Sequence, residues 1–185
     1  MNLAPRGQLG WLLGLVLMSL SCAAWPQQAD GDADEAHVKA AFVYKFTGYV
    51  DWPDSTPGSG ADAPFVMGVL GSEALLGELT QLTAGRKVHE RPVLVRKLRA
   101  GEALGGLQLL LVGRGEVLRA EVPKAVLVVT EAEGGMPRGS MINFVLVDRH
   151  VRFEIALPAV EKAGLRMSSR LLAVAQKVHQ GEEQR

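Results

Sequence analysis

The chain has 185 residues, of which 48% are hydrophobic, and its 20 basic side chains balance 20 acidic ones. This length suits one domain with one core, and the balanced charge provides no overall basic field that would attract nucleic acid. We therefore expect one domain, over residues 35–180, and no nucleic-acid partner. The four histidines lie in separate segments without an i, i+4 pair, so we expect neither a metal site nor another cofactor.

Residues 1–24 have the order of a cleavable signal peptide. Arg6 precedes the apolar run LGWLLGLVLMSL, and the small residues of SCAA follow it. We expect export with cleavage near Ala24 and no membrane span afterwards. A membrane-anchoring helix and lipidation of Cys22 stay open as alternatives, although Leu20 lies nearer to this cysteine than a lipoprotein box requires. Cleavage would remove the only cysteine, so the mature protein, with 19 basic and 20 acidic residues, would have no disulfide.

Residues 40–53, AAFVYKFTGYVDWP, carry five aromatic rings in a chain that is only 5% aromatic. Four apolar positions fall at helical spacing and predict one buried face: Val38, Phe42, Phe46 and Tyr49. We expect a flexible lead over residues 25–34 and then a long first helix that begins near Glu35. Pro53 disfavours helical geometry at Trp52. Core packing explains most of the rings, and an exposed ring or two in a partner surface is the alternative.

After the turn-forming residues 54–64, strand patterns alternate with helical ones. Strands are predicted at residues 65–71, 91–98, 107–113 and 125–130. Helices are predicted at residues 73–84, where Ser72 is the cap, and at residues 114–122, where Pro123 ends the pattern. The runs LQLLLV and AVLVVT are apolar on both faces, which is typical of the interior of a parallel sheet.

The C-terminal third of the chain predicts a hairpin followed by two helices. Strands at residues 141–147 and 151–157 are close enough to pair antiparallel, although their turn lacks glycine. Helices are predicted from Pro158 to Gly164 and, after a Ser168 cap, over residues 169–178, with a tail at 181–185. We therefore predict an α/β fold: a single domain with a mostly parallel sheet, helices on both faces as in Rossmann- or flavodoxin-like proteins, and a C-terminal antiparallel hairpin.

The catalytic motifs that this layout could carry are missing from the sequence. The turn GVLGSE lacks the spacing of a phosphate-binding loop, and no G-x-S-x-G elbow occurs, so we expect no enzyme activity. Arg152 and Glu154 alternate with apolar residues in the strand VRFEIAL. They form either a solvated strand face with cross-strand ion pairs or a binding surface.

Two segments together resemble the YfiR/HmsC-like family of periplasmic proteins. The first is VKAAFVYKFTGYVDWP, in which these residues match: Lys39, Ala40, Ala41, Phe46, Trp52 and Pro53. The second is GSMINFVLVDRHVRFEIALPAVEKAGLRMSSRLLAVAQKV, in which these residues match: Ile142, Phe144, Arg152, Phe153, Glu154, Ile155, Leu157, Gly164, Leu165, Ser168, Ser169, Leu171 and Leu172. The two blocks lie at opposite ends of the predicted domain, so the resemblance spans essentially all of the mature chain.

The resemblance implies a periplasmic regulator that binds the periplasmic domain of an inner-membrane GGDEF-type diguanylate cyclase and represses it, which lowers cyclic di-GMP and biofilm formation. It also implies a homodimer. The expected partner-binding residues lie in the two blocks but off the apolar stripes: Tyr44, Trp52, Arg152, Glu154 and Arg166. Better-known relatives carry cysteine pairs tied to redox control, which the mature chain lacks. The alternative function is a periplasmic small-ligand-binding accessory of another membrane receptor or kinase, with its pocket at the loops after GVLG and VVT.

Overall fold

The computed structural model describes residues 27–53 and 63–181. The predicted signal peptide, its cleavage near Ala24 and the question of Cys22 lie outside the described residues. So do most of the predicted loop after Pro53 and residues 182–185 of the tail.

Most of the described strands form one sheet of eight, in the order β10-β8-β7-β6-β5-β2-β4-β3. Its strands are β2 (Phe65–Leu70), β3 (Lys87–Val88), β4 (Arg91–Leu98), β5 (Leu109–Val112), β6 (Leu127–Thr130), β7 (Ile142–Val147), β8 (His150–Ala156) and β10 (Lys177–His179). Strands β4, β2, β5, β6 and β7 run one way, and β3, β8 and β10 run the other way. The sheet is therefore mixed, and the prediction of a mostly parallel sheet is wrong.

The two reversals arise at two-residue turns. Asp148 and Arg149 join β7 to β8 with φ of 50° and 62°, and His89 and Glu90 join β3 to β4 with φ of 49° and 63°. Consecutive left-handed residues make the tight turn whose twist matches an antiparallel pair, and a loop this short cannot connect parallel strands. Aspartate tolerates the left-handed region, so the first turn forms without glycine.

The first helix, α1, spans Gln27–Phe46, so regular structure begins earlier than the predicted start near Glu35. Its buried positions are Ala36, Lys39, Ala40, Val43 and Phe46. This face is displaced from the predicted stripe. Val38 is 40% exposed, and Tyr49, which follows the helix, is 41% exposed. The prediction for these two residues is wrong because Val38 lies on a side of α1 away from its buried face, and because α1 ends before Tyr49.

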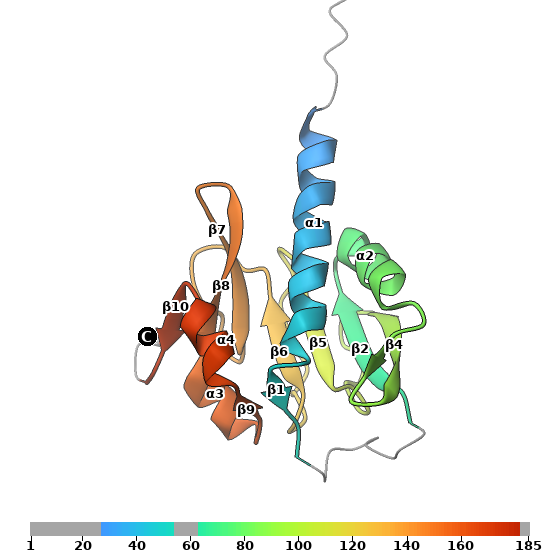
Figure 1. Ribbon diagram of the computed structural model, residues 1–185, viewed down its shortest axis with the longest axis vertical. Helices are drawn as coiled ribbons and strands as arrows, with labels where there is room; N and C mark the ends of the chain where they lie inside the picture. Colours follow the sequence, from blue (N-terminus) through green and yellow to red (C-terminus); the bar gives the residue numbers. More distant parts are fainter. Residues whose placement is uncertain (1–26, 54–62, 182–185) are drawn as a thin grey trace, which may run out of the picture.

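The second helix, α2 (Glu73–Thr83), forms as predicted. The Ser72 hydroxyl accepts a hydrogen bond from the backbone N–H of Leu75, which satisfies one of the free donors of the first turn. Leu75 and Leu79 are fully buried. The helix lies beside α1 and against β4 (Figure 1).

The helix predicted at residues 114–122 does not form, and this segment is coil with one turn at its start. The close approach of Gly113 to Gly71 explains its path. A Cβ on Gly113 would lie 2.7 Å from the carbonyl O of Gly71, so the chain leaves β5 in contact with the end of β2. Gly115, with φ of 78°, then turns it away from helical geometry.

After β8 the chain forms α3 (Leu157–Lys162), β9 (Arg166–Met167) and α4 (Ser169–Val174). The Ser168 cap is confirmed, because its hydroxyl accepts a hydrogen bond from the N–H of Arg170. The predicted helix over 169–178 is too long, however. It ends at Val174, and residues 177–179 instead extend the sheet as β10, parallel to β8.

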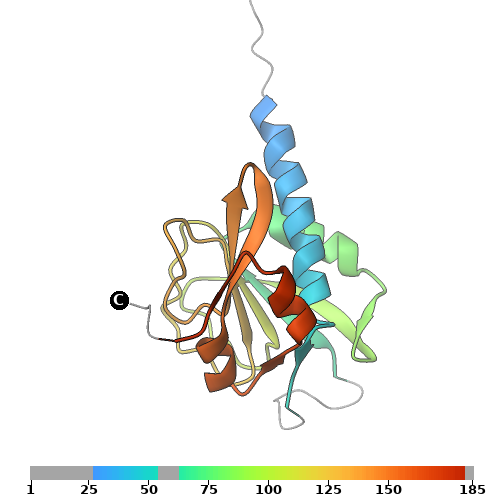
Figure 2. The ribbon, with the colours of Figure 1, turned by 60° about the vertical axis from the view of Figure 1, so that its left-hand side comes forward.

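Helices α1 and α2 cover one face of the sheet, and loops cover much of the other (Figure 2). Helix α3 lies at the end of the sheet where β6 begins, since the N–H of Ala125 donates to the carbonyl O of Ala163. The described structure thus differs from a sheet with helices covering both faces. The loop-covered face holds a pocket.

Candidate functional site

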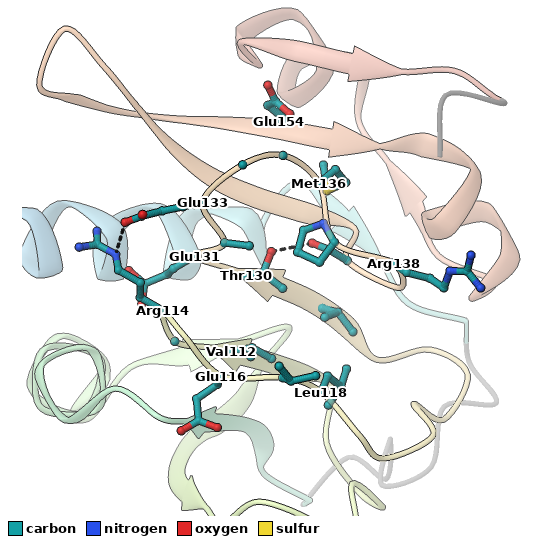
Figure 3. Close-up of a pocket in the computed structure, with 18 of the residues that line it drawn as sticks. Val112, Arg114, Glu116, Leu118, Thr130, Glu131, Glu133, Met136, Arg138 and Glu154 are labelled. Atoms are coloured by element: carbon teal, nitrogen blue, oxygen red, sulfur yellow. Dashed lines mark hydrogen bonds and ion pairs between the residues drawn. The ribbon is translucent and has the colours of Figure 1, made fainter. Parts of the chain in front are cut away.

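A pocket of about 1100 Å³ lies over the loop-covered face, at the carboxyl ends of β5 and β6 (Figure 3). Residues 112–118 and 130–138 form two of its walls, and β8 and β10 form a third. Carboxyl ends of neighbouring parallel strands are a common place for a binding site, because the chain diverges into loops there. One of the two loops expected to form a pocket, the loop after VVT, lines it.

The lining of this pocket combines apolar and ionisable side chains. Val112, Leu118, Val128 and Met136 contribute apolar surface. The ionisable residues of the lining are Arg114, Glu116, Glu131, Glu133, Arg138, Glu154, Lys177 and His179. Such a lining favours an amphipathic occupant over a purely ionic one.

The loop of residues 131–140 is held in place by Asn143, which is fully buried on β7. Its side-chain Oδ1 accepts a hydrogen bond of 2.6 Å from the Thr130 hydroxyl and one of 2.9 Å from the N–H of Ala132. Its Nδ2 donates to the carbonyl O of Ala132 at 3.0 Å. Ser140 completes this buried polar cluster, 2.9 Å from the Thr130 hydroxyl. The pocket wall is therefore braced by satisfied hydrogen bonds.

An ion network joins α1 to the same end of the sheet. The Lys39 side chain is buried and contacts the carboxylates of Glu35 and, at 2.5 Å, Glu131. Arg114 extends the network, 3.0 Å from Glu35 and 3.3 Å from Glu133, and Figure 3 shows this last contact. One helix and the loops after β5 and β6 are thus held together by paired charges.

A contact between a histidine and a carboxylate lies on the other side of the pocket. His179 on β10 lies 3.0 Å from the carboxylate of Glu154 on β8, and both side chains are mostly buried. Glu154 belongs to the set of expected partner-binding residues, and this contact places it in the pocket wall.

The structure does not gather the five expected partner-binding residues in one place. Trp52 and Arg166 are near each other, because Arg166 pairs in register with Asp51, the residue before Trp52, where β1 (Val50–Asp51) meets β9. Arg152 is exposed and shares a face of β8 with Glu154. The hydroxyl of Tyr44 lies 3.4 Å from the carbonyl O of Lys87 on β3.

Trp52 is half-buried, and much of its ring is used in packing. It lies edge-on against Phe65, with ring centroids 5.1 Å apart, and its Nε1 donates to the carbonyl O of Gln108 at 3.2 Å. His89 packs against the same indole, with ring centroids 5.8 Å apart. The indole of Trp52 therefore has a structural role, whether or not its exposed part also binds a partner.

Sequence reasoning missed Lys39, Glu131 and Arg114 as a group. Lys39 stands in the first of the two family blocks, beside the small apolar residues Ala40 and Ala41. Lys39 and Glu131 are 92 positions apart. A charged residue within an apolar helical face was the one signal that the sequence offered, since a buried lysine needs a carboxylate partner.

Within the residues that the structure describes, no helix is long and apolar enough to cross a membrane, and no group of three or more His, Cys, Asp or Glu could hold a metal ion. Gly71, the second glycine of the GVLGSE turn, has a role in packing. A Cβ on Gly71 would lie 2.0 Å from the Cγ of Glu116, whose side chain occupies the space beside that turn.

The fold and the site define a mixed α/β domain with a loop-walled pocket. The chain belongs to the YfiR/HmsC-like family, which matches residues 36–176. Members of this family are regulatory rather than catalytic, and the family is periplasmic and implies interaction with a membrane partner. No curated protein matches the chain.

Proposed function

We propose that this protein is a periplasmic repressor of an inner-membrane diguanylate cyclase, which it inhibits by binding the cyclase's periplasmic domain. The family match over residues 36–176 carries this proposal. Binding alone can switch an enzyme if the regulator prefers the inactive state, and a shift from mostly active to mostly inactive needs about 5.5 kcal/mol of preference.

Two features of the structure support a role in binding. The two sequence blocks form a shared aromatic core, in which Phe46 of α1 packs 5.0 Å from Phe153 of β8 and 5.9 Å from Phe144 of β7. The blocks also meet where β1 pairs with β9. Two exposed residues of the second block, Arg152 and Arg166, are thus held on a rigid frame, which suits an interface.

We propose Tyr44, Trp52, Arg152, Glu154 and Arg166 as contacts to the cyclase. Aromatic and arginine side chains supply most of the binding energy in many interfaces. Arg152 and Arg166 are the exposed members of this set, so their substitution tests binding with the least effect on folding. A homodimer of this chain belongs to the same proposal.

The test is deletion of the gene followed by measurement of cellular cyclic di-GMP. We expect the level to rise, and to fall again when the wild-type gene is restored. The variants Arg152→Ala and Arg166→Ala should restore repression less well, whereas Arg170→Ala, which changes an exposed arginine of α4, should restore it fully. Unchanged cyclic di-GMP in the deletion strain would remove the repressor function, and full rescue by the first two variants would remove only those contacts.

The pocket of about 1100 Å³ favours a second candidate function, the binding of a small ligand as an accessory of a membrane receptor or kinase. Its mixture of apolar and ionisable lining residues fits an amphipathic molecule. A thermal-shift screen of small metabolites against the purified protein tests this function. A metabolite that raises the unfolding temperature of the wild-type protein should not raise that of Met136→Ala. It should still raise that of Val174→Ala, which changes an exposed residue of α4.

A further inference from the structure

One edge of the sheet has backbone groups without a strand partner among the described residues. Strand β4 pairs with β2 from Val93 to Leu98, but on its other side β3 pairs only with Arg91 and Pro92. The outer side of residues 93–98 is therefore an open edge. Such an edge is a template for another extended chain.

The direction of the backbone groups on this edge follows from one hydrogen bond. The N–H of Val93 donates to the carbonyl O of Arg86, across the turn from β4 and away from β2. Backbone groups alternate in direction along a strand, so those of Val95 and Lys97 also point outward. These two residues offer an incoming strand two donors and two acceptors.

The same edge is the most basic part of a chain whose net charge is zero. Residues 86–99 contain one acidic residue, Glu90, and six basic ones: Arg86, Lys87, Arg91, Arg96, Lys97 and Arg99. Arg96 pairs with Glu102, and Lys97 pairs with Glu73. Arg86, Lys87 and Arg99 are exposed, so the edge keeps a positive field.

Two further contacts make this edge suitable for docking. Leu94 is 48% exposed on the face of β4 away from α2, where it offers an apolar contact beside the basic groups. The guanidinium of Arg86 lies 5.2 Å from the centre of the Tyr44 ring, which supports the start of the edge from α1. Tyr44, one of the expected partner-binding residues, thus contacts the start of this segment.

We propose that the outer edge of β4 binds an extended acidic segment of the partner's periplasmic domain, which adds as a further strand. This proposal rests on the proposed function for the identity of the partner. The outward backbone groups would supply the main-chain hydrogen bonds, and the basic side chains would select a segment rich in Asp and Glu. A second copy of this chain is a poorer occupant, because pairing β4 with itself would bring two basic edges together.

The first experiment locates the contact in cells. A photo-crosslinking residue replaces Leu94 at the edge or, as a control, Val174 on α4, which is 65% exposed. We expect the Leu94 position to crosslink an acidic segment in the periplasmic domain of a diguanylate cyclase. Crosslinking of the cyclase from position 174 and not from position 94 would overturn the β4 proposal and leave the repressor function intact. Crosslinking to a second copy of this chain alone would also overturn it.

The second experiment separates backbone pairing from charge, with the purified periplasmic domain of the crosslinked cyclase as the probe. Lys97→Gln removes one charge, whereas Lys97→Pro also removes the outward N–H without touching the pairing with β2. We expect Lys97→Gln to weaken binding about threefold and Lys97→Pro about tenfold or more, with unchanged thermal unfolding in both. If Lys97→Pro unfolds, Val95→Pro tests the neighbouring outward N–H.

Equal affinities of the folded proline and glutamine variants would overturn strand addition. An anionic lipid surface is the competing source of negative charge. Binding to phosphatidylglycerol vesicles that falls with Lys97→Gln and Arg99→Gln, together with no crosslink to a protein, would assign the edge to lipid and overturn the proposal. Wild-type cyclic di-GMP in the deletion strain would instead count against the repressor function itself.

Discussion

The Nζ atom of Lys39 lies 2.5 Å from Oε1 of Glu131, although these two residues are 92 positions apart in the chain. Lys39 is 3% exposed and also contacts Glu35 one turn earlier in α1. The ion pair joins the first helix to the carboxyl end of β6, where the wall of the pocket begins.

We expect Lys39→Met to destabilise the protein by about 3–5 kcal/mol, because it leaves the buried carboxylate of Glu131 without its cation. Urea denaturation measures this loss. Lys45→Met, which changes an exposed lysine of the same helix, serves as the control and should change stability little. The double variant Lys39→Met/Glu131→Leu should recover part of the loss. A loss below about 1 kcal/mol for Lys39→Met would contradict a structural role for the pair.

Phe46→Ala should cost about 3–5 kcal/mol, because the ring is 1% exposed and packs against Phe42, Phe144 and Phe153. The mature chain is expected to have no disulfide that would compensate for the cavity. Tyr49→Ala is the matched control, and we expect it to cost about 1 kcal/mol or less, since that ring is 41% exposed. Equal losses in the two variants would show that the aromatic core is not where the structure places it.

The carboxyl of Glu102 should titrate below its ordinary pKa. The backbone N–H of Arg99 donates to it at 3.0 Å, and the guanidinium of Arg96 donates at 2.5 Å, and both lower its pKa in that order of importance. A lowered pKa in the folded state stabilises the protein above the unfolded pKa, and this contribution is lost as the pH falls through the folded value. The effect on stability is small because the group is exposed.

An NMR titration of the Glu102 side chain measures this directly. Arg96→Gln should raise its pKa only in part, since the backbone donor remains. Arg138→Gln, which changes an exposed arginine that lines the pocket, should leave the pKa of Glu102 unchanged. A Glu102 pKa at or above the ordinary value in the unmodified protein would contradict the geometry of this loop.

Export should leave a mature protein that begins near Trp25. The reason is the order of Arg6, the apolar run and the small residues before that position. Intact-mass spectrometry of the protein from a periplasmic fraction checks this expectation. An intact Met1 or a lipid on Cys22 would be incompatible with it.

Much of the fold could be predicted from local sequence patterns. Strand β4 and the helix α2, with its Ser72 cap, occur where their patterns indicate. The apolar runs of β5 and β6 are buried on both faces, as predicted. These features depend on neighbouring residues, and a short window of sequence contains the physical cause of each one.

Where the same patterns failed, a distant segment decided the outcome. Residues 114–122 have a helical pattern, but the contact between Gly113 and Gly71 directs the chain into coil. Residues 177 and 178 are predicted as the end of a helix and instead belong to β10, which pairs with β8. Pairing with a neighbouring strand gives hydrogen-bond partners to the backbone groups on that side of the strand. A local sequence pattern does not indicate whether such a neighbour is present.

The site shows the same division. By itself the sequence determined the two blocks that define the family, the lack of familiar catalytic motifs and the burial of Phe46. Only the tertiary structure decided that Lys39 would be buried against Glu131, that Trp52 and Arg166 would lie near each other, and that residues 93–98 would form an open edge among the described residues. A sequence displays the spacing of residues along the chain, whereas charges and strand edges act on whatever the fold brings within a few ångströms.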